Sequence, residues 1–483
     1  MNSVRRIVKN LGASLIAQIS TPATSFVLVF FIARLLGASG LGKYSTTISL
    51  LFIFQALASL GLPYLITREV ARDNANAPKY LINASLLGGF FSVFTAAAMC
   101  VCGLALTEDP DTIKATYLLS ISLIPYTIAL VCQSICKGFE RLEFFALPLV
   151  IGNCAKMLIG LLVLLKGYGL VELIVVIVLS HFLIFFISLY FAIRCMPSDV
   201  HFGSQIDLGF CRAIMMASPT FALISIFGTI RFNIDILMIN KLMGDLDVGI
   251  YSAALKLVNF SKFGIICYIM ALQPVIFRLF RSSRQKFEKV CIESIRYLLI
   301  MIIPIMAGIT ILSDRIVGSI FGKEFLASGY ALSILIWILI LAGFNQLFAN
   351  ALVASGNQKT NLHATFLSMV LNIGLNLLLI PQMGYIGAAL ANVAAALFHF
   401  GYQYYFISKS LFKLRFYQLA KKPVVATVIM SIAVLAARDL NLLVVVVLSC
   451  LAYFVSLLVA KAFTENDINL IRSVFSKETE LRI

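Results

Sequence analysis

Long apolar runs alternate with short polar or basic segments along almost the whole chain. Runs of about 18 apolar residues are long enough to cross a bilayer as helices. Fourteen runs can be placed, at residues 11–33, 44–67, 81–106, 115–136, 146–165, 170–193, 213–240, 249–277, 292–313, 328–355, 362–383, 385–408, 423–437 and 442–460. This pattern predicts an all-α polytopic membrane protein with about fourteen transmembrane helices.

The composition supports this class and excludes an ordinary soluble protein. Of the 483 residues, 61% are hydrophobic and only 12% are charged, whereas soluble domains carry about 25% charged residues. The ten cysteines form no C-x-x-C or Cys/His spacing that would indicate a metal site. We therefore interpret them as small apolar side chains.

The distribution of basic residues predicts how the chain is oriented. With the N-terminus inside, cytoplasmic segments hold 25 Lys and Arg residues and outer segments hold 8, as the positive-inside rule requires. Both termini are then cytoplasmic, with position 110 outside and positions 75, 205, 285 and 415 inside. The net charge of +16 is explained by anionic lipids, and no nucleic acid partner is predicted.

An internal repeat relates the two halves of the chain. Residues 34–50 match residues 241–257 at six of seventeen positions. Gly138 and Gly356, and also Gly169 and Gly387, recur at an offset of 218 residues. Six spans separate the copies, which indicates a parallel repeat. The predicted units are a six-helix lobe at 1–208, a second at 209–410, an additional helix pair at 411–463 and a cytoplasmic tail at 464–483.

The repeated segments carry a family resemblance. The motifs are RLLGASGLGKY at 34–44, KLMGDLDVGIYSAA at 241–254, FGKEF at 321–325, ASGNQK at 354–359 and GYIGAA at 384–389. With these motifs the chain resembles the polysaccharide transporter branch of the MOP superfamily, which includes Wzx-type O-antigen flippases. MurJ-type lipid II flippases and MATE drug exporters are relatives of that branch.

The resemblance implies an architecture and a function. It implies two pseudo-symmetric six-helix lobes around a central cavity that opens alternately to the two sides. The implied substrate is an undecaprenyl-diphosphate-linked oligosaccharide of O-antigen or a related surface polysaccharide, moved from the cytoplasmic to the periplasmic leaflet of a bacterial inner membrane. A polysaccharide polymerase and chain-length machinery are the implied partners. A MATE-like drug or cation exporter and a lipid II flippase are the alternatives, although MATE exporters usually have twelve spans.

Charges inside predicted spans are the main candidates for a substrate site. Each costs at least about 2.5–3.5 kcal/mol at a helix centre unless it is paired or hydrated. The predicted substrate-binding set, a cationic cavity, comprises Arg34, Lys156, Arg231, Asp235, Lys256 and Lys262. Its excess of cations suits an anionic diphosphate. Arg34 lies at the outer end of the first span, where it is either a gate or headgroup contact or a plain interfacial anchor.

Arg231 and Asp235 have two interpretations. They are four residues apart and share a helix face, so an internal ion pair is sterically natural. Alternatively, Arg231 belongs to the cationic cavity while Asp235 pairs with it or exchanges a proton. Amides inside the spans line a sugar cavity or join helices through hydrogen bonds. They are Gln18, Gln55, Gln133, Asn153, Asn259, Gln273, Asn345, Gln346, Asn350, Asn372, Asn376 and Asn392.

No catalytic constellation is visible in the sequence. It contains four histidines, without a Ser/His/Asp arrangement or a phosphate-binding P-loop. The longest internal loop, about residues 194–212, is too short to hold the active site of a membrane polymerase or glycosyltransferase. We therefore predict a non-enzymatic protein without a cofactor, and coupling to a H⁺ or Na⁺ gradient stays open as its energy source.

Overall fold

The computed structural model describes residues 2–196 and 206–460, and every element in those ranges is a helix. The first half contains α1 (Asn2–Ser59), α2 (Leu62–Arg72), η1 (Asn74–Asn76), α3 (Ala77–Leu106), α4 (Pro110–Ile121), α5 (Leu123–Gly138), α6 (Leu142–Leu165) and α7 (Leu170–Cys195). The second contains α8 (Leu208–Ala217), α9 (Pro219–Met243), α10 (Asp245–Ser261), α11 (Phe263–Ser282), α12 (Arg284–Ile320), η3 (Lys323–Phe325), α13 (Ser328–Leu335), α14 (Ile338–Ala354) and α15 (Gln358–Ser410). The last pair is α16 (Phe416–Ala436) and α17 (Leu442–Val459). The all-α prediction is confirmed.

Two of these helices each contain two predicted spans. α1 and α15 are 58 and 53 residues long, so straight helices of that length would measure about 80 Å or more. Each instead bends at a glycine with positive φ, Gly37 (φ 71°) and Gly384 (φ 59°), a conformation that side chains with a Cβ rarely adopt. By length and composition twelve described helical segments can cross a membrane. With two crossings in α1 and two in α15, they account for the fourteen predicted spans.

One predicted span begins too early. The run from 213 to 240 is divided at Ser218 into α8 and α9. Pro219 starts α9, where its missing N–H costs nothing, whereas inside one continuous helix it would remove a hydrogen bond of the preceding turn. α8 therefore precedes the membrane-spanning helix as a separate short segment. The predicted tail at 464–483 and position 205 lie outside the described residues.

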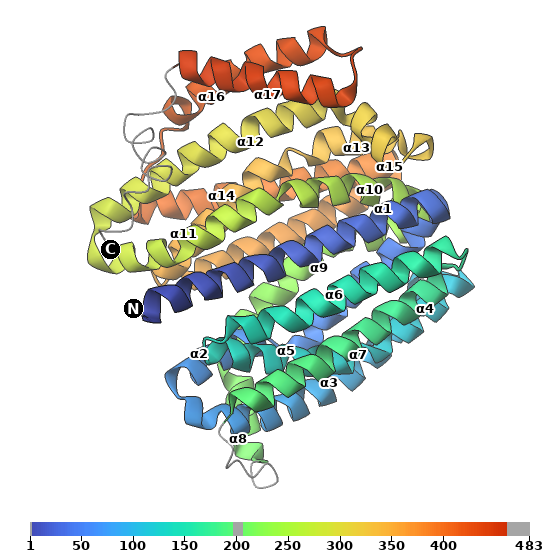
Figure 1. The fold of residues 1–483 in the computed structure, drawn as a ribbon, viewed down its shortest axis with the longest axis vertical. Helices are drawn as coiled ribbons and strands as arrows, with labels where there is room; N and C mark the ends of the chain where they lie inside the picture. The colour runs from blue at the N-terminus through green and yellow to red at the C-terminus, as the bar shows by residue number, and fades with distance from the viewer. Residues whose placement is uncertain (1, 197–205, 461–483) are drawn as a thin grey trace.

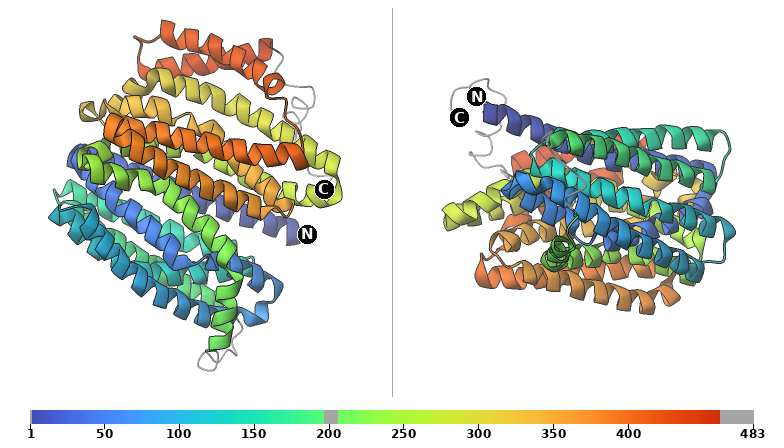
Figure 2. Two further views of the ribbon diagram at one scale, coloured as in Figure 1. Left: turned by 180° about the vertical axis from the view of Figure 1, so that it is seen from behind. Right: turned by 90° about the horizontal axis from the view of Figure 1, so that it is seen from below.

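The helices form two lobes that meet along α1. Within the first lobe α1 packs on α6, and α5 packs on α3 and α7; within the second, α15 packs on α9 and α14. α1 also packs on α9 and α10 of the second lobe. Figure 1 shows the first lobe in blue to green below the second in yellow to orange, and Figure 2 shows the same helices from behind and below.

The additional helix pair packs against the edge of the second lobe. Met430 of α16 and Leu457 of α17 share a buried cluster with Leu312 of α12. The Tyr453 hydroxyl donates to the Ile300 carbonyl at 2.6 Å. The Arg315 guanidinium donates to the carbonyls at the connection between α16 and α17. These contacts join the pair to α12, as Figure 1 shows.

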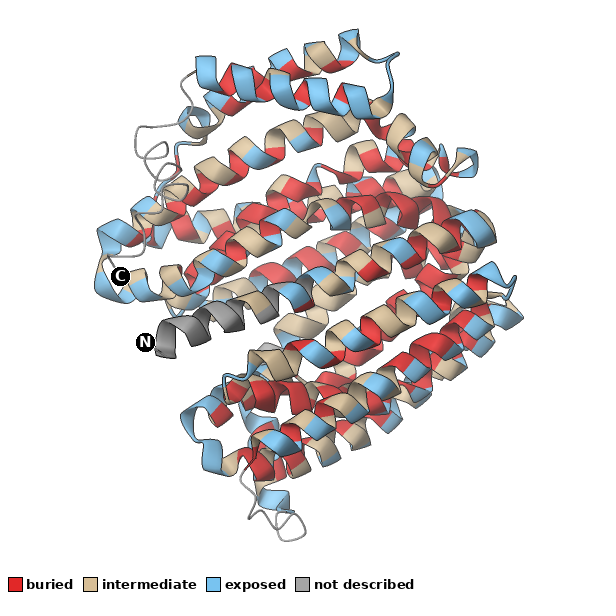
Figure 3. Cartoon of the chain, in the orientation of Figure 1, coloured by how far each residue is buried: buried red, intermediate tan, exposed pale blue. Residues whose placement is uncertain are grey.

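Large apolar side chains remain exposed on the outer helices. Val101, Leu179 and Phe454 are each more than half exposed, and Figure 3 shows exposed segments along the outward faces. Such a surface would aggregate in water, but it is the expected contact with lipid tails. The chain is therefore a multi-pass membrane protein.

Candidate functional site

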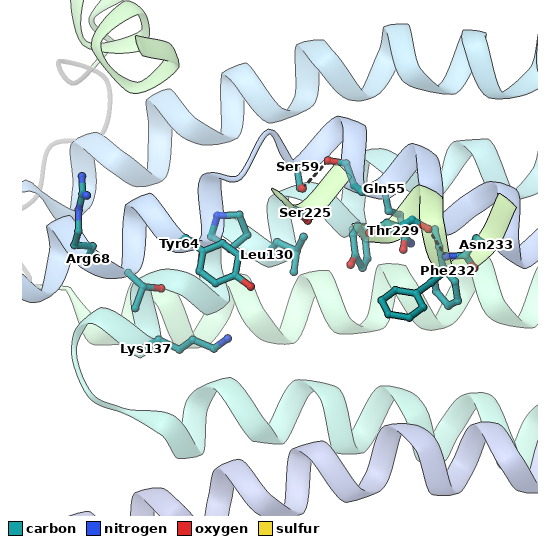
Figure 4. A pocket seen from close by; sticks show the side chains of 15 residues that line it. Gln55, Ser59, Tyr64, Arg68, Leu130, Lys137, Ser225, Thr229, Phe232 and Asn233 are labelled. Atoms are coloured by element: carbon teal, nitrogen blue, oxygen red, sulfur yellow. Dashed lines mark hydrogen bonds between the residues drawn. The ribbon is translucent and has the colours of Figure 1, made fainter. Parts of the chain in front are cut away.

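A cavity of about 740 Å³ lies between the lobes. The first lobe contributes Gln55, Tyr64, Arg68 and Lys137, and α9 of the second contributes Ser225, Thr229, Phe232 and Asn233. Figure 4 shows Arg68 and Lys137 toward one end and Phe232 with Asn233 toward the other. The lining combines hydroxyls, amides and aromatic rings, which is the surface that polar ligands with ring systems require.

Two smaller cavities border the first at Phe232, which lines all three. One, of about 330 Å³, lies between the lobes and is lined by Lys256, Asn259 and Lys262. The other, of about 320 Å³, lies inside the second lobe and is lined by Arg231 and again by Lys262. The three hollows are therefore neighbours around one phenylalanine ring, and we call them together the central cavity.

The charged residues known to line the central cavity are all basic. Its described lining includes Arg68, Lys137, Arg231, Lys256 and Lys262 but neither aspartate nor glutamate. Charges in a low-dielectric enclosure act over longer distances than charges in water. Five cations without a carboxylate therefore give the cavity a strong preference for anions.

Neutral groups hold these cations in place. The Lys262 ammonium donates to Asn259 Oδ1 at 3.0 Å and lies 5.7 Å from the Phe232 ring centre. The Arg231 guanidinium lies 5.1 Å from the same ring. Lys137 lies 3.9 Å above the Phe145 ring. Because amides and rings orient a cation without cancelling its charge, the ammonium and guanidinium groups stay available to an anion.

The predicted ion pair between Arg231 and Asp235 is not formed. Arg231 Nη1 lies 3.2 Å from His399 Nδ1, and no ion pair joins the two residues where the structure describes side chains. The order of the charges is one reason, because a basic residue four positions before an acidic one is the less favourable arrangement on a helix.

Asp235 is instead enclosed by neutral donors. Its carboxylate accepts from the Tyr251 hydroxyl at 2.8 Å, from Asn376 Nδ2 at 2.7 Å and from Asn392 Nδ2 at 2.5 Å. The residue is fully buried. Asn372 adjoins it, because its Oδ1 accepts from Asn376 at 3.3 Å. These three hydrogen bonds supply the partners that a buried carboxylate needs.

Two other predicted site residues, Lys156 and Arg34, are not among the residues that line the three hollows. The Lys156 ammonium donates to Asn153 Oδ1 at 3.0 Å, and Asn153 donates to Thr21 Oγ1 at 2.9 Å, so Lys156 sits between α6 and α1. Arg34 is exposed and donates at 2.8 Å to each of the Ser319 and Ile320 carbonyls at the end of α12. Of the predicted set, the structure brings Arg231, Lys256 and Lys262 together around the central cavity.

Two cavity cations, Arg68 and Lys137, were not predicted from the sequence. Arg68 and Lys137 were assigned to cytoplasmic segments because they flank predicted spans, and the structure places both in the largest of the three hollows. The only available signal was that their spans, 44–67 and 115–136, end on the same side of the predicted membrane. Basic residues at such ends ordinarily contact lipid headgroups, so this signal was too weak to identify them.

The lobes touch backbone to backbone at one end of the central cavity. Gly42 lies against the carbonyl of Asp245, and Gly249 lies against the carbonyl of Ala38, so closely that a Cβ on either glycine would overlap that oxygen. Gly42 and Gly249 occupy equivalent positions in the repeat, and so do Ala38 and Asp245. The two contacts are therefore related by the internal symmetry, as in an isologous interface.

One side chain reinforces this contact across the lobes, because Glu324 accepts from the Ala38 amide at 2.8 Å. Beside it, within the first lobe, Lys43 forms an ion pair with Asp109 at 2.6 Å. Burial raises the pKa of Asp109, but its hydrogen bonds with Lys43 and Thr112 outweigh that effect and hold the pKa below its ordinary value. The carboxylate is thus charged at neutral pH. We call the contacts around Gly42 and Gly249 the glycine seal.

The sequence matches known proteins. Residues 7–280 match the family described as "Polysaccharide biosynthesis protein", and residues 221–378 match MatE. The chain is 25% identical over 382 residues to the "Probable low-salt glycan biosynthesis flippase Agl15" of Haloferax volcanii, covering 78% of each chain. It is 21% identical to the "Capsular polysaccharide biosynthesis protein CapF" of Staphylococcus aureus, covering 84% of this chain and 100% of that protein.

A solved structure shows the same fold. "Lipid II flippase MurJ, inward closed conformation" aligns with a TM-score of 0.72 at 16% identity, covering 93% of this chain and 98% of that one. The arrangement of two lobes with an additional helix pair is therefore shared with a flippase of known structure.

Proposed function

The chain belongs to the polysaccharide biosynthesis protein family of the MOP superfamily, whose members include membrane flippases, and from this premise we propose that it moves a lipid-linked oligosaccharide. The substrate is an undecaprenyl-diphosphate-linked unit of O-antigen or a related surface polysaccharide. It passes from the cytoplasmic to the periplasmic leaflet by alternating access. The polymerase and chain-length machinery that use the product are the partners we expect.

The observation that carries this proposal is the charge of the central cavity. A diphosphate must cross the low-dielectric membrane interior, where an unpaired charge is costly. Five lining cations without a carboxylate lower that barrier. The same lining repels a cationic drug, so it argues against the MATE-like alternative. Lipid II also carries a diphosphate, so the charge of the cavity does not distinguish it from the proposed substrate. The two substrates differ in their glycans.

Asp235 is the group that we propose couples transport to a H⁺ or Na⁺ gradient. Its carboxylate is fully buried and close to the amides of Asn372 and Asn376. Carboxylate and amide oxygens are the ligands that hard cations prefer, and protonation is the other way to neutralise such a group. An ion bound there would bias the packing of α9 on α15 without occupying the central cavity.

Reconstitution tests the proposed function. Purified protein in liposomes is expected to speed the appearance, in the opposite leaflet, of a fluorescent oligosaccharide linked to undecaprenyl diphosphate, measured with a membrane-impermeant glycosidase. An imposed pH or Na⁺ gradient should change the rate, and Asp235→Asn should remove that change. Transport of ethidium without movement of the glycolipid would contradict the proposal. Faster movement of lipid II than of the oligosaccharide would favour the lipid II alternative.

Reporter fusions test the predicted orientation. Position 110 is expected outside, and positions 75, 285 and 415 inside, because Lys and Arg accumulate on the cytoplasmic side. The measurement is paired alkaline phosphatase and fluorescent protein fusions at each position. An outside result at 285 would contradict the predicted topology, since the connection between α11 and α12 would then lie on the wrong side.

A further inference from the structure

The hollow inside the second lobe has the properties of a separate binding pocket. It has a volume of about 320 Å³ and is lined by residues of α9, α11, α14 and α15 and by Lys262, which lies between α10 and α11. It adjoins the rest of the central cavity at Phe232 and Lys262, which border both hollows. A ligand held between the lobes at Lys262 can therefore extend one group into this pocket.

Four polar atoms of its lining residues are buried without a hydrogen-bond partner. They are Arg231 Nε, His399 Nε2, Asn345 Oδ1 and Gln403 Oε1. Arg231 and His399 are only 4% and 7% exposed, so bulk water does not satisfy them. Native proteins leave few buried polar groups unpaired, and each such group calls for an explanation. Four around one pocket indicate a polar guest.

The hydrogen-bonding roles of these atoms follow from their neighbours. A guanidinium only donates, so His399 Nδ1, which lies 3.2 Å from Arg231 Nη1, is an acceptor and carries no proton. The proton of the neutral ring is then on Nε2. The pocket therefore offers two donors, Arg231 Nε and His399 Nε2, and two acceptors, the amide oxygens of Asn345 and Gln403. Gln403 is oriented by donating to Asn361 Oδ1 at 2.8 Å.

Apolar side chains also line the pocket. They include Ile265 and Ile269 of α11, Ile338 of α14 and the Phe232 ring. A ligand therefore needs hydroxyl or amide groups for the polar atoms and a methyl group or ring face for these apolar side chains. The volume is near the lower limit for small-molecule pockets, which suits a single ring. An N-acetylated pyranose has these features, because its acetamido group pairs with amides and carries a methyl.

On the basis of the proposed function, we propose that this pocket binds the sugar bonded directly to the diphosphate and selects an N-acetylated amino sugar. Lys256 and Lys262 line the adjoining hollow between the lobes, where they bind the diphosphate. The first sugar is then next to Phe232, at the boundary of the pocket. The amides Asn345 and Gln403 contact its acetamido group, while the remaining sugars extend into the large hollow between the lobes.

Binding of three short-chain probes to the purified protein tests the pocket. The probes are farnesyl diphosphate, farnesyl-diphospho-glucose and farnesyl-diphospho-N-acetylglucosamine, titrated by calorimetry. The unmodified protein is expected to bind the N-acetylglucosamine probe about tenfold more tightly than the glucose probe, because paired hydrogen bonds in a buried site discriminate to about this degree. Asn345→Leu combined with Gln403→Leu should remove the tenfold preference and leave farnesyl diphosphate binding unchanged.

The controls separate a failed pocket from a failed function. Gln346→Leu, at an exposed amide that also lines the pocket, should weaken the preference if the double variant does not fold. Gln418→Leu on α16, outside the pocket, should retain it in full. Equal affinity for all three probes, or a preference that survives in the folded double variant, overturns the sugar subsite and indicates ordered water only. No binding of any probe by the unmodified protein overturns the proposed function, and the subsite with it.

Discussion

Lys262→Ala is expected to lower transport of the lipid-linked oligosaccharide about 100-fold while the protein stays folded. Among the described residues, the Lys262 ammonium contacts an amide oxygen and a ring but no carboxylate, so its removal strands no acidic partner there. A folded membrane protein should therefore accumulate normally. The loss of transport comes from the diphosphate, because one cation a few ångströms away in a partly desolvated site contributes about 2–4 kcal/mol, and 1.4 kcal/mol corresponds to a tenfold change.

This result is checked by measuring surface polysaccharide together with the amount of the variant protein in the membrane. Arg231→Ala should behave in the same way as Lys262→Ala. Lys114→Ala is the control, because Lys114 is an exposed residue of α4 and lines none of the three hollows. Normal polysaccharide in both cavity variants would show that transport does not need these cations, and would contradict the cationic cavity. Loss of the protein itself would instead point to a role of these cations in folding.

Arg231 and Asp235 show that the partners of a buried charge could not be predicted from the sequence. Their spacing places both on one face of α9, and from one helix alone an ion pair is the natural expectation. The structure adds α15, which brings Asn376 and Asn392 to Asp235 and His399 to Arg231. Contacts between residues more than 140 positions apart depend on how the helices pack, and no local pattern encodes them. Asp235 is therefore the candidate for ion coupling, and Arg231 is a cation of the central cavity.

The fold was more predictable than the site for a physical reason. A helix that crosses a membrane needs about 20 predominantly apolar residues, so spans are visible in the sequence, and the repeat indicated how two sets of them are related. Which basic residue enters a cavity depends on the tilt of its helix instead. Lys256 and Lys262 were conspicuous because they lie within a span, whereas Arg68 and Lys137 at span ends had the appearance of interfacial charges.

Gly42→Ala is expected to abolish transport by preventing the glycine seal from closing. A Cβ at this position overlaps the Asp245 carbonyl oxygen, and a backbone carbonyl in a helix cannot move aside as a flexible side chain can. The lobes must then stay apart at this end, and alternating access fails because one of its two closed states is lost. Gly249→Ala should have the same effect through Ala38, since the internal symmetry relates the two contacts.

Gly89→Ala provides a matched control. Gly89 is also inside a helix, α3, but a Cβ there meets no other atom within 4 Å. Gly89→Ala therefore raises helix propensity as Gly42→Ala does, but it causes no clash. Transport should fall about 100-fold in Gly42→Ala and remain normal in Gly89→Ala. A cysteine placed at Ser45, which is buried beside the seal and lines the hollow with Lys256, should react faster with a membrane-impermeant thiol reagent in the Gly42 and Gly249 variants than in Gly89→Ala, because their seal cannot close. Equal transport and equal labelling in Gly42→Ala and Gly89→Ala would mean that the lobes need not touch here during the transport cycle.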